Sequence, residues 1–343
     1  MMMKKIYKYI LAGALCFMVA ACEDFDTLNQ DPNNPVEIPS HMLMNGAQKS
    51  IMDDIYDAWF SGRQCLLYSQ YWVQRNYTEE DRYQIRESEN NSKFDALYRG
   101  VANLQKVVAL NMDEQTKGNN ARYGANCNQI AAAIILKVWL MGIITDTWGS
   151  VPYTDVGKLE EGVLYCKYDE QKTIYKTLID ELTTAVNGID ESKVAFVSGD
   201  MIYGGDASKW KKFGNSLKCR LAVHLSKVDP NWKTYISEAV ASGVFTSNAD
   251  AAAFNYSSSG LDFCKFYANY YVDGRNDFTI SKTLTDILKG EADALNGKSH
   301  PWTDVIDPRL RMYTTSYDGA YNGIPYGAPT ENMSSLRPGT PNW

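Results

Sequence analysis

The 343-residue sequence has little histidine and no closely spaced cysteine pair. Its three His are scattered, and none of its seven Cys forms a Cys-x-x-Cys motif, so no zinc-site spacing is present. It also lacks an HExxH motif, a Gly-x-Ser-x-Gly elbow and a glycine loop that could cradle a phosphate. We therefore expect no metal and no cofactor, and we expect a protein that is not an enzyme.

Basic residues are in the minority. The sequence has 34 Lys and Arg against 41 Asp and Glu, a formal net charge of -7. Affinity for nucleic-acid phosphates comes mostly from clustered Lys and Arg, so this balance argues against a nucleic-acid partner. Tyr, in contrast, is abundant, and its 23 residues outnumber the 11 Phe and 8 Trp together. A ring with a hydroxyl suits a half-wet binding surface, although protein cores use it too.

The first 22 residues are typical of a targeting signal. A start with three Lys precedes the apolar stretch 10–21, which is too short to span a bilayer but suits a signal peptide. The stretch ends in Val-Ala-Ala-Cys at 19–22, which resembles a bacterial lipobox and implies cleavage before Cys22 and lipidation of that residue. An ordinary secretory signal followed by a coincidental cysteine is the alternative.

These features predict three parts of the chain. Residues 1–21 form the signal peptide, and residues 22–40 form an acylated tether that is acidic at its start and then rich in proline. Residues 41–343 form the folded domain.

The hydrophobic pattern of that domain is mainly helical. Apolar residues at helical spacing predict helices over 42–60, 94–110, 129–144, 168–186, 206–227, 229–243 and 281–289. Segment 129–144 is apolar almost all round, so we expect a central buried helix there and not a membrane span, since it is short and contains Lys137. We predict a mainly α fold, a tetratricopeptide-like scaffold of helical hairpins whose long irregular loops carry the ligand surface.

Four short motifs resemble those of the SusD/RagB family of nutrient-binding lipoproteins of the outer membrane. They are 146–155 (DTWGSVPYTD), 210–222 (WKKFGNSLKCRLA), 275–282 (RNDFTISK) and 307–310 (DPRL). They occur in the family's order, together with the lipobox and the acidic tether. We expect most of their side chains to build the scaffold and not to contact a ligand.

The resemblance implies a lipid-anchored protein of the cell outer membrane, exposed at the surface. It would capture an oligosaccharide and pass it to a SusC-like TonB-dependent transporter, without cleaving it. A peptide-binding member of the family, or a helical interaction scaffold without a small ligand, are the alternatives. Members of the family usually continue past the DPRL turn, so the resemblance also implies a chain that lacks its C-terminal part.

The stretch 68–83 is the first candidate for ligand contacts. Binding a sugar needs flat aromatic faces with hydrogen-bonding side chains around them, and this stretch interleaves the two without helical periodicity. From this loop we select Trp72, Tyr77, Arg82 and Tyr83. The alternative is that its first aromatic residues complete a helical hairpin as core.

The stretch 263–278 is the second candidate, and from it we select Tyr270, Arg275 and Asn276. Packing of its rings on the scaffold is the alternative, and Trp302 is a weaker third candidate. Acidic residues such as Glu79, Glu80 and Asp81 form a charge run in the first loop, which we expect to be solvated and not catalytic.

Overall fold

The computed structural model describes residues 38–258, 262–291, 301–316 and 319–336, without the side chains of Glu160 and Ser334. The chain divides into two units, Met1–Pro39 and Ser40–Trp343, and the elements below all belong to the second. The predicted signal peptide, Cys22 and the tether as far as residue 37 lie outside the described residues. The signal, the lipid anchor and the division into domains therefore stay predictions.

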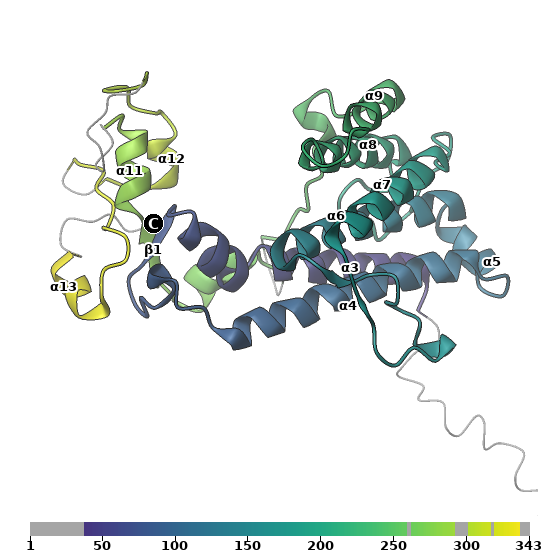
Figure 1. The fold of residues 1–343 in the computed structure, drawn as a ribbon, viewed down its shortest axis with the longest axis horizontal. Helices are drawn as coiled ribbons and strands as arrows, with labels where there is room; N and C mark the ends of the chain where they lie inside the picture. The colour runs from purple at the N-terminus through teal and green to yellow at the C-terminus, as the bar shows by residue number, and fades with distance from the viewer. Residues whose placement is uncertain (1–37, 259–261, 292–300, 317–318, 337–343) are drawn as a thin grey trace, which may run out of the picture. The chain divides into compact units, whose positions relative to one another are not determined.

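The scaffold consists of long helices that pack in the order of the chain (Figure 1). They are α3 (Ser40–Ile55), α4 (Glu87–Met112), α6 (Asn126–Trp148), α7 (Gln171–Asn187), α8 (Ala207–His224) and α9 (Trp232–Ser242). From α3 to α9, each long helix contacts the next one along the chain, and α6 also contacts α8. Successive antiparallel hairpins of this kind confirm the predicted mainly α, tetratricopeptide-like fold class.

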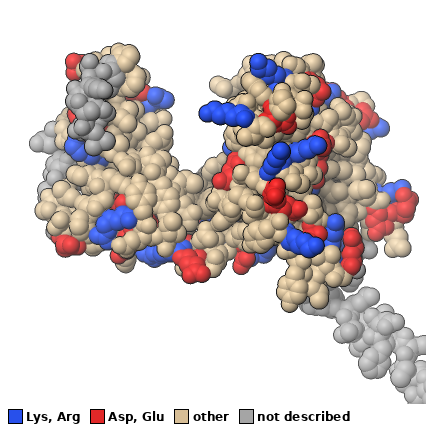
Figure 2. Space-filling view, in the orientation of Figure 1, with Lys and Arg blue, Asp and Glu red and all other residues tan. Residues whose placement is uncertain are grey.

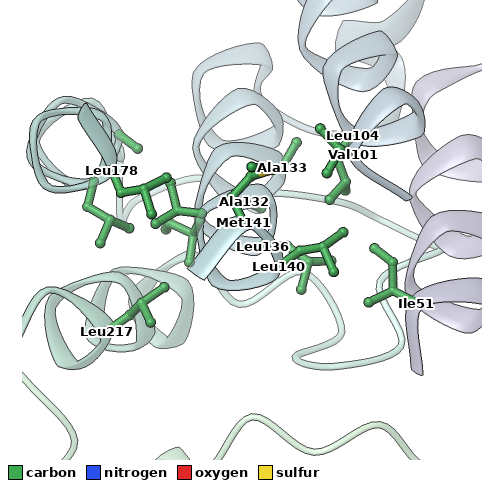
Figure 3. Close-up of a cluster of buried hydrophobic side chains, with 14 of the residues drawn as sticks. Ile51, Val101, Leu104, Ala132, Ala133, Leu136, Leu140, Met141, Leu178 and Leu217 are labelled. Atoms are coloured by element: carbon green, nitrogen blue, oxygen red, sulfur yellow. The ribbon is translucent and has the colours of Figure 1, made fainter. Parts of the chain in front are cut away.

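Helix α6 is the centre of the core, as predicted. Its fully buried Leu140 belongs to one cluster with Ile51 of α3, Val101 of α4, Leu178 of α7 and Leu217 of α8 (Figure 3). By length and composition α6 is apolar enough to cross a membrane, but 67% of its most apolar window is buried inside the protein. Burying a side chain such as Leu140 contributes about 2 kcal/mol, so packing against α4, α7 and α8 stabilises α6 inside the protein.

Two glycines let these helices approach closely. A Cβ atom added to Gly100 of α4 would lie 2.7 Å from Cγ1 of Ile51, and one added to Gly214 of α8 would lie 2.6 Å from Cγ2 of Val186. Both distances are shorter than real Cβ contacts, so only a residue without a Cβ atom fits at these two positions.

The predicted helix 42–60 is wrong at its C-terminal end. Helix α3 ends at Ile55, and a π-helix, η2 (Ala58–Leu66), begins after Asp57. Asp57 has an extended backbone, and its carboxylate accepts the N–H groups of Trp59 and Phe60 at 3.2 and 2.5 Å, which caps η2. The apolar spacing from Ile55 to Trp59 continues the helical period across this break, which is why the pattern concealed it.

Each of the other predicted helices overlaps an observed one, including 281–289 with α11 (Lys282–Leu288). Asp206, the first residue of the predicted helix 206–227, caps α8 by accepting the N–H groups of Ser208 and Lys209. The predicted start of α7 is three residues early, because Tyr168–Asp169 form a strand.

Short strands and turns connect the helices and extend beyond them. The strands β1 (Trp72–Gln74) and β4 (Phe278–Ile280) pair antiparallel, as do β2 (Val151–Pro152) and β3 (Tyr168–Asp169). The remaining short elements are η3 (Glu80–Arg82), α5 (Lys117–Asn120), η4 (Ala121–Tyr123), η5 (Leu159–Glu161), η6 (Asn248–Asp250), α10 (Lys265–Tyr267), η7 (Ala268–Val272), α12 (Leu310–Tyr313), η8 (Thr330–Asn332) and α13 (Met333–Leu336).

The Gly- and Pro-rich segment near the C-terminus packs behind β1 where it is described. Ile324 and Met333 are buried with Val73 in a small cluster of their own. The hydroxyl groups of Thr78 and Thr330 lie 2.9 Å apart in a hydrogen bond beside it. This irregular segment therefore supports the strand that carries the first candidate loop.

Candidate functional site

The structure brings the two candidate stretches together. Strand β1 belongs to the first stretch, and β4 begins at the last residue of the second. The backbone N–H of Arg75 donates to the carbonyl oxygen of Asp277 at 2.5 Å. The Asp277 carboxylate accepts from Asn76 Nδ2 at 3.3 Å and from Arg275 Nε at 2.8 Å. Residues about 200 positions apart thus form one surface, which we call the β1–β4 surface and define as 68–83 with 263–278.

Four of the selected residues are open to solvent on this surface. Tyr77 and Tyr83 are 55% and 57% exposed, and Arg82 and Asn276 are exposed as well. Both tyrosines have positive φ angles, 56° and 59°, in the left-handed region that costs a non-glycine residue free energy. The loop therefore holds its two rings outward in a backbone conformation that the surrounding contacts must maintain.

The other three selected residues are half-buried. Trp72 packs against Phe266 and Phe278, with ring centroids 5.6 and 5.3 Å away, so much of its ring belongs to a small core. This is the core-packing alternative that the sequence left open for this residue. Arg275 has its guanidinium on Asp277 at 2.6 Å. A ligand role for these residues stays a prediction.

Tyr270 is the third half-buried residue. It meets Tyr271 edge to face, with centroids 4.7 Å apart, and Tyr271 is itself 69% exposed. Trp302, the weaker candidate, is 49% exposed. The second stretch thus has an aromatic surface. Tyr271 is more exposed than Tyr270 or Trp302.

A polar cleft that the sequence did not indicate adjoins the second stretch. Its volume is about 880 Å³, and it lies where α3, the start of η2 and the side of α4 meet α10 and η7. Helix α3 contributes one polar face to it through Asn45, Lys49 and Asp53, which are spaced four residues apart. The rest of the lining comprises Gly46, Ser50, Asp54, Asp57, Ala58, Trp59, Arg99, Lys265, Ala268, Asn269 and Asp273.

Trp59 is the one large aromatic side chain in this lining. It is half-buried, and the guanidinium of Arg63 lies over its ring at 3.9 Å from the centroid. Sequence reasoning assigned Trp59 to the apolar face of the first helix. The signal that could have corrected this is Asp57, a residue type that caps helices, two positions before the ring.

The charges in the cleft are partly paired. Asp53 lies 2.5 Å from Lys49 and 3.4 Å from Lys265. Burial raises the pKa of Asp54, although Lys93 and Arg99 oppose the shift. The guanidinium of Arg99 makes no hydrogen bond or ion pair with another described residue.

The side chain of Asp273, at the η7 side of the cleft, likewise makes no hydrogen bond or ion pair within the described part of the chain. The cleft therefore offers one face of an indole, several amide and carboxylate groups, and one charged side chain of each sign that makes no hydrogen bond or ion pair with the described residues. Such a set can hold the hydroxyl groups of a polar ligand while the ring contacts its apolar face.

The expected solvated charge run is wrong for two of its acids. Glu80 and Asp81 are 3% and 2% exposed. Glu80 lies 3.2 Å from Arg63 and 2.9 Å from Arg86, so it is part of a buried ion-pair network. Burial raises the pKa of Asp81 to about 7, since its Oδ2 has only the Gln74 N–H, at 2.8 Å, as a donor.

Charges of both signs are interspersed over the face of the molecule that Figure 2 shows. No group of three or more His, Cys, Asp or Glu residues that could hold a metal ion occurs within the described ranges. The five cysteines of that part of the chain are all free thiols.

The family motif at 210–222 builds the scaffold, as expected. Trp210 is fully buried, and its indole N–H donates to Oδ2 of Asp200 at 2.7 Å. Asn215 Nδ2 donates to the carbonyl oxygen of Gly243 at 2.8 Å and so fixes the end of α9. Residues 32–339 match the model of the SusD-like family that is described as starch-binding and associating with the outer membrane. The chain belongs to the SusD-like family.

Solved structures of SusD homologues share the fold of this SusD-like protein. One from Parabacteroides distasonis is 23% identical with a TM-score of 0.70, over 86% of this chain and 60% of its own. A chitin-binding SusD homologue from Flavobacterium johnsoniae is 23% identical with a TM-score of 0.65, over 87% of this chain and 60% of its own.

A SusD-like protein from Bacteroides thetaiotaomicron is 21% identical with a TM-score of 0.62, over 89% of this chain and 60% of its own. The chain thus spans 60% of the length of each of these three structures. A comparison with curated proteins gave no match. The family resemblance carried by the four motifs is confirmed. The comparisons do not identify the ligand of this chain or the residues that contact it.

Proposed function

We propose that this SusD-like protein captures an oligosaccharide at the outer surface of the cell and does not cleave it. The observation that carries the proposal is the cleft, where Trp59 lies among carboxylates, amides and ammonium groups next to an exposed tyrosine surface. Sugar rings bind such sites by stacking an apolar face and hydrogen-bonding their hydroxyls. The description of the family as starch-binding, and the chitin-binding homologue, support the same ligand class.

Two of the four carboxylates in the cleft are suited to recognition and not to hydrolysis. A glycosidase needs one carboxyl that is protonated and a second that acts as base or nucleophile. Asp53 is held by two lysines, and Asp57 is bonded to Lys93 at 2.6 Å while it also caps η2. Carboxylates that are fixed in this way serve as hydrogen-bond acceptors.

Calorimetry with maltohexaose and chitohexaose tests the proposal. We expect at least one of them to bind, and Trp59→Ala to weaken its affinity at least tenfold, because the stacking face is lost. Tyr83→Ala should weaken it as well if the β1–β4 surface extends the site. Tyr165→Ala is the matched control, since this tyrosine is 89% exposed on the loop between β2 and β3.

Three results would decide against parts of the proposal. Binding that survives Trp59→Ala but not Tyr83→Ala would place the site on the β1–β4 surface alone. Release of reducing ends from either glycan would show an enzyme. Failure of all glycans to bind would leave the helical interaction scaffold as the function.

A peptide is the second candidate ligand, because the unpaired Arg99 and Asp273 could receive the two charged termini of a short peptide. Calorimetry with a mixture of tetra- to hexapeptides distinguishes the two classes. Arg99→Gln should abolish peptide binding and leave glycan binding within about threefold, since a neutral sugar does not need the charge.

Delivery to a SusC-like TonB-dependent transporter, and anchoring by a lipid on Cys22, complete the proposal. The family's outer-membrane association supports both. Cys22→Ser should release the protein from the membrane fraction. The unmodified protein should copurify with a large β-barrel partner, and its absence from such preparations would contradict the delivery step.

A further inference from the structure

Asp81 lies on the inner side of the turn that carries Tyr83 outward. The two residues are separated by Arg82 only, and the Tyr83 N–H donates to the Glu80 carbonyl oxygen at 2.8 Å, which closes the turn. The turn is joined to β1 through Gln74, whose N–H donates to Oδ2 of Asp81. Any change in how Asp81 is held therefore acts on the backbone that positions Tyr83.

The second oxygen of Asp81 is buried without a partner. Oδ1 makes no hydrogen bond with the described residues, and Asp81 as a whole is 2% exposed. The hydroxyl of Tyr68, whose ring stacks on Tyr83 with centroids 5.5 Å apart, is likewise buried and unpartnered. A buried ionised oxygen without a donor is costly, whereas a neutral carboxyl is much less so.

No cation of the described residues forms an ion pair with Asp81. Arg63 and Arg86 form ion pairs with Glu80. The side chain of Arg82 is exposed to solvent. The titratable and charged groups that act on Asp81 among the described residues are Glu80, Arg82 and Tyr326, and Tyr68 and Tyr83 act on Tyr326 in turn. Burial raises the pKa of Tyr326, and Asp81 is the next cause, which places that phenol beside the carboxyl.

We propose that Asp81 is a positioning residue for Tyr83, which couples ligand capture at the β1–β4 surface to the pH of the medium. While the carboxyl is neutral the turn stays closed, and the Tyr83 ring remains stacked on Tyr68. Ionisation of the Asp81 carboxyl destabilises the closed turn, so that the Tyr83 ring separates from the Tyr68 ring. The link to capture rests on the proposed function, but the link between Asp81 and the ring does not.

The size of the effect follows from the pKa of about 7. The neutral fraction of Asp81 falls about tenfold between pH 6 and pH 8, and the apparent affinity of a site falls with the fraction that is competent to bind. The Kd for the maltohexaose or chitohexaose that binds should therefore rise about tenfold over this range in the unmodified protein. In Asp81→Asn, which cannot ionise, the change should stay under about twofold.

A second measurement needs no ligand. A 4-fluorophenylalanine at position 83 reports the ring's surroundings by fluorine NMR, and this ring does not itself ionise. Its resonance should shift with a midpoint near pH 7 in the full chain and stay constant in Asp81→Asn. Tyr77 labelled in the same way, on the same loop, is the control and should not follow this titration.

The outcomes separate the two proposals. A titrating fluorine signal without any glycan binding supports the role of Asp81 and contradicts the proposed function. Glycan binding with the same pH profile in both proteins, and a constant fluorine signal, overturns the inference. Should Asp81→Asn fail to fold, the fluorine-labelled chain with Asp81 intact provides the test. A chemical shift that stays constant from pH 5.5 to 8.5 refutes the inference.

Discussion

The ion pair between Lys93 and Asp57 should dominate the stability of the segment that carries Trp59. Lys93 Nζ lies 2.6 Å from Asp57 Oδ2 and 3.0 Å from the carbonyl oxygen of Asp54, and both ionic side chains are about nine-tenths buried. This lysine of α4 thus ties the last turn of α3 to the cap of η2. Removing Lys93 leaves the buried Asp57 carboxylate without a cation, whereas removing Asp57 leaves Lys93 with the Asp54 carbonyl oxygen and, at 3.9 Å, the Asp54 carboxylate.

The magnitude can be worked out from these contacts. Asp57→Ala removes an N-cap, worth about 1 kcal/mol, and takes from the Lys93 ammonium its closest carboxylate, which should cost about 3 kcal/mol because Asp54 stays 3.9 Å away. Lys93→Met strands the Asp57 carboxylate at a similar cost but leaves the cap in place. The double variant strands neither charge, so it should lose only about 1–2 kcal/mol, and the coupling between the two sites should exceed 2 kcal/mol.

Urea unfolding followed by circular dichroism measures all three variants. Lys117→Met is the control, because its pair with Glu114 lies at the surface, with side chains 43% and 82% exposed, and should be worth under about 1 kcal/mol. If either single variant costs less than about 1 kcal/mol, or if the two costs simply add in the double variant, the account of a desolvated, coupled pair is refuted.

Three further predictions concern the scaffold and the turn. Gly214→Ala should cost about 1–3 kcal/mol of unfolding free energy, because its Cβ would collide with side chains of α6 and α7, whereas Gly142→Ala, with a Cβ contact of 3.6 Å, should be neutral or stabilising by under about 1 kcal/mol. Asp81 has a pKa of about 7 in the folded state, against 3.8 in the unfolded chain. The carboxyl therefore costs the folded state nothing below about pH 4, and the free energy of unfolding falls as the pH rises from there through 7. The stability of Asp81→Asn relative to the unmodified protein should therefore rise between pH 5 and pH 8, by up to about 3 kcal/mol, and an unchanged difference in urea midpoints would contradict the burial argument. Asp200→Ala leaves the buried indole N–H of Trp210 and several backbone N–H groups without an acceptor, so its thermal midpoint should fall much further than that of Trp210→Phe, which removes one donor.

Much of the scaffold could be predicted because its signals are local. Apolar residues every three or four positions gave the long helices, and Asp206 gave the start of α8. The all-round apolar stretch around Leu140 indicated the central helix without any knowledge of its neighbours. The break at Asp57 escaped this reasoning, because a π-helix continued the apolar spacing from Ile55.

The candidate site was less accessible to the sequence. Aromatic and polar residues predicted the two candidate stretches that β1 and β4 join. Nothing in the sequence of either stretch indicated that the two would pair with each other. The cleft beside them was missed altogether, since Trp59 has the spacing of a core residue and Asp53 that of a solvated helix face.

The sequence by itself determined the helical class, the order of the hairpins and the family, because helical periodicity, caps and motifs depend on residues a few positions apart. The tertiary structure alone decided which groups meet. It placed Arg63 and Arg86 on Glu80, left Asp81 buried without an ion-pair partner among the described residues, and brought Asn76 to Asp277 across about 200 residues. Burial and electrostatic partners arise from such long-range contacts, so the chemistry of a loop carboxyl cannot be read from its neighbours in the chain.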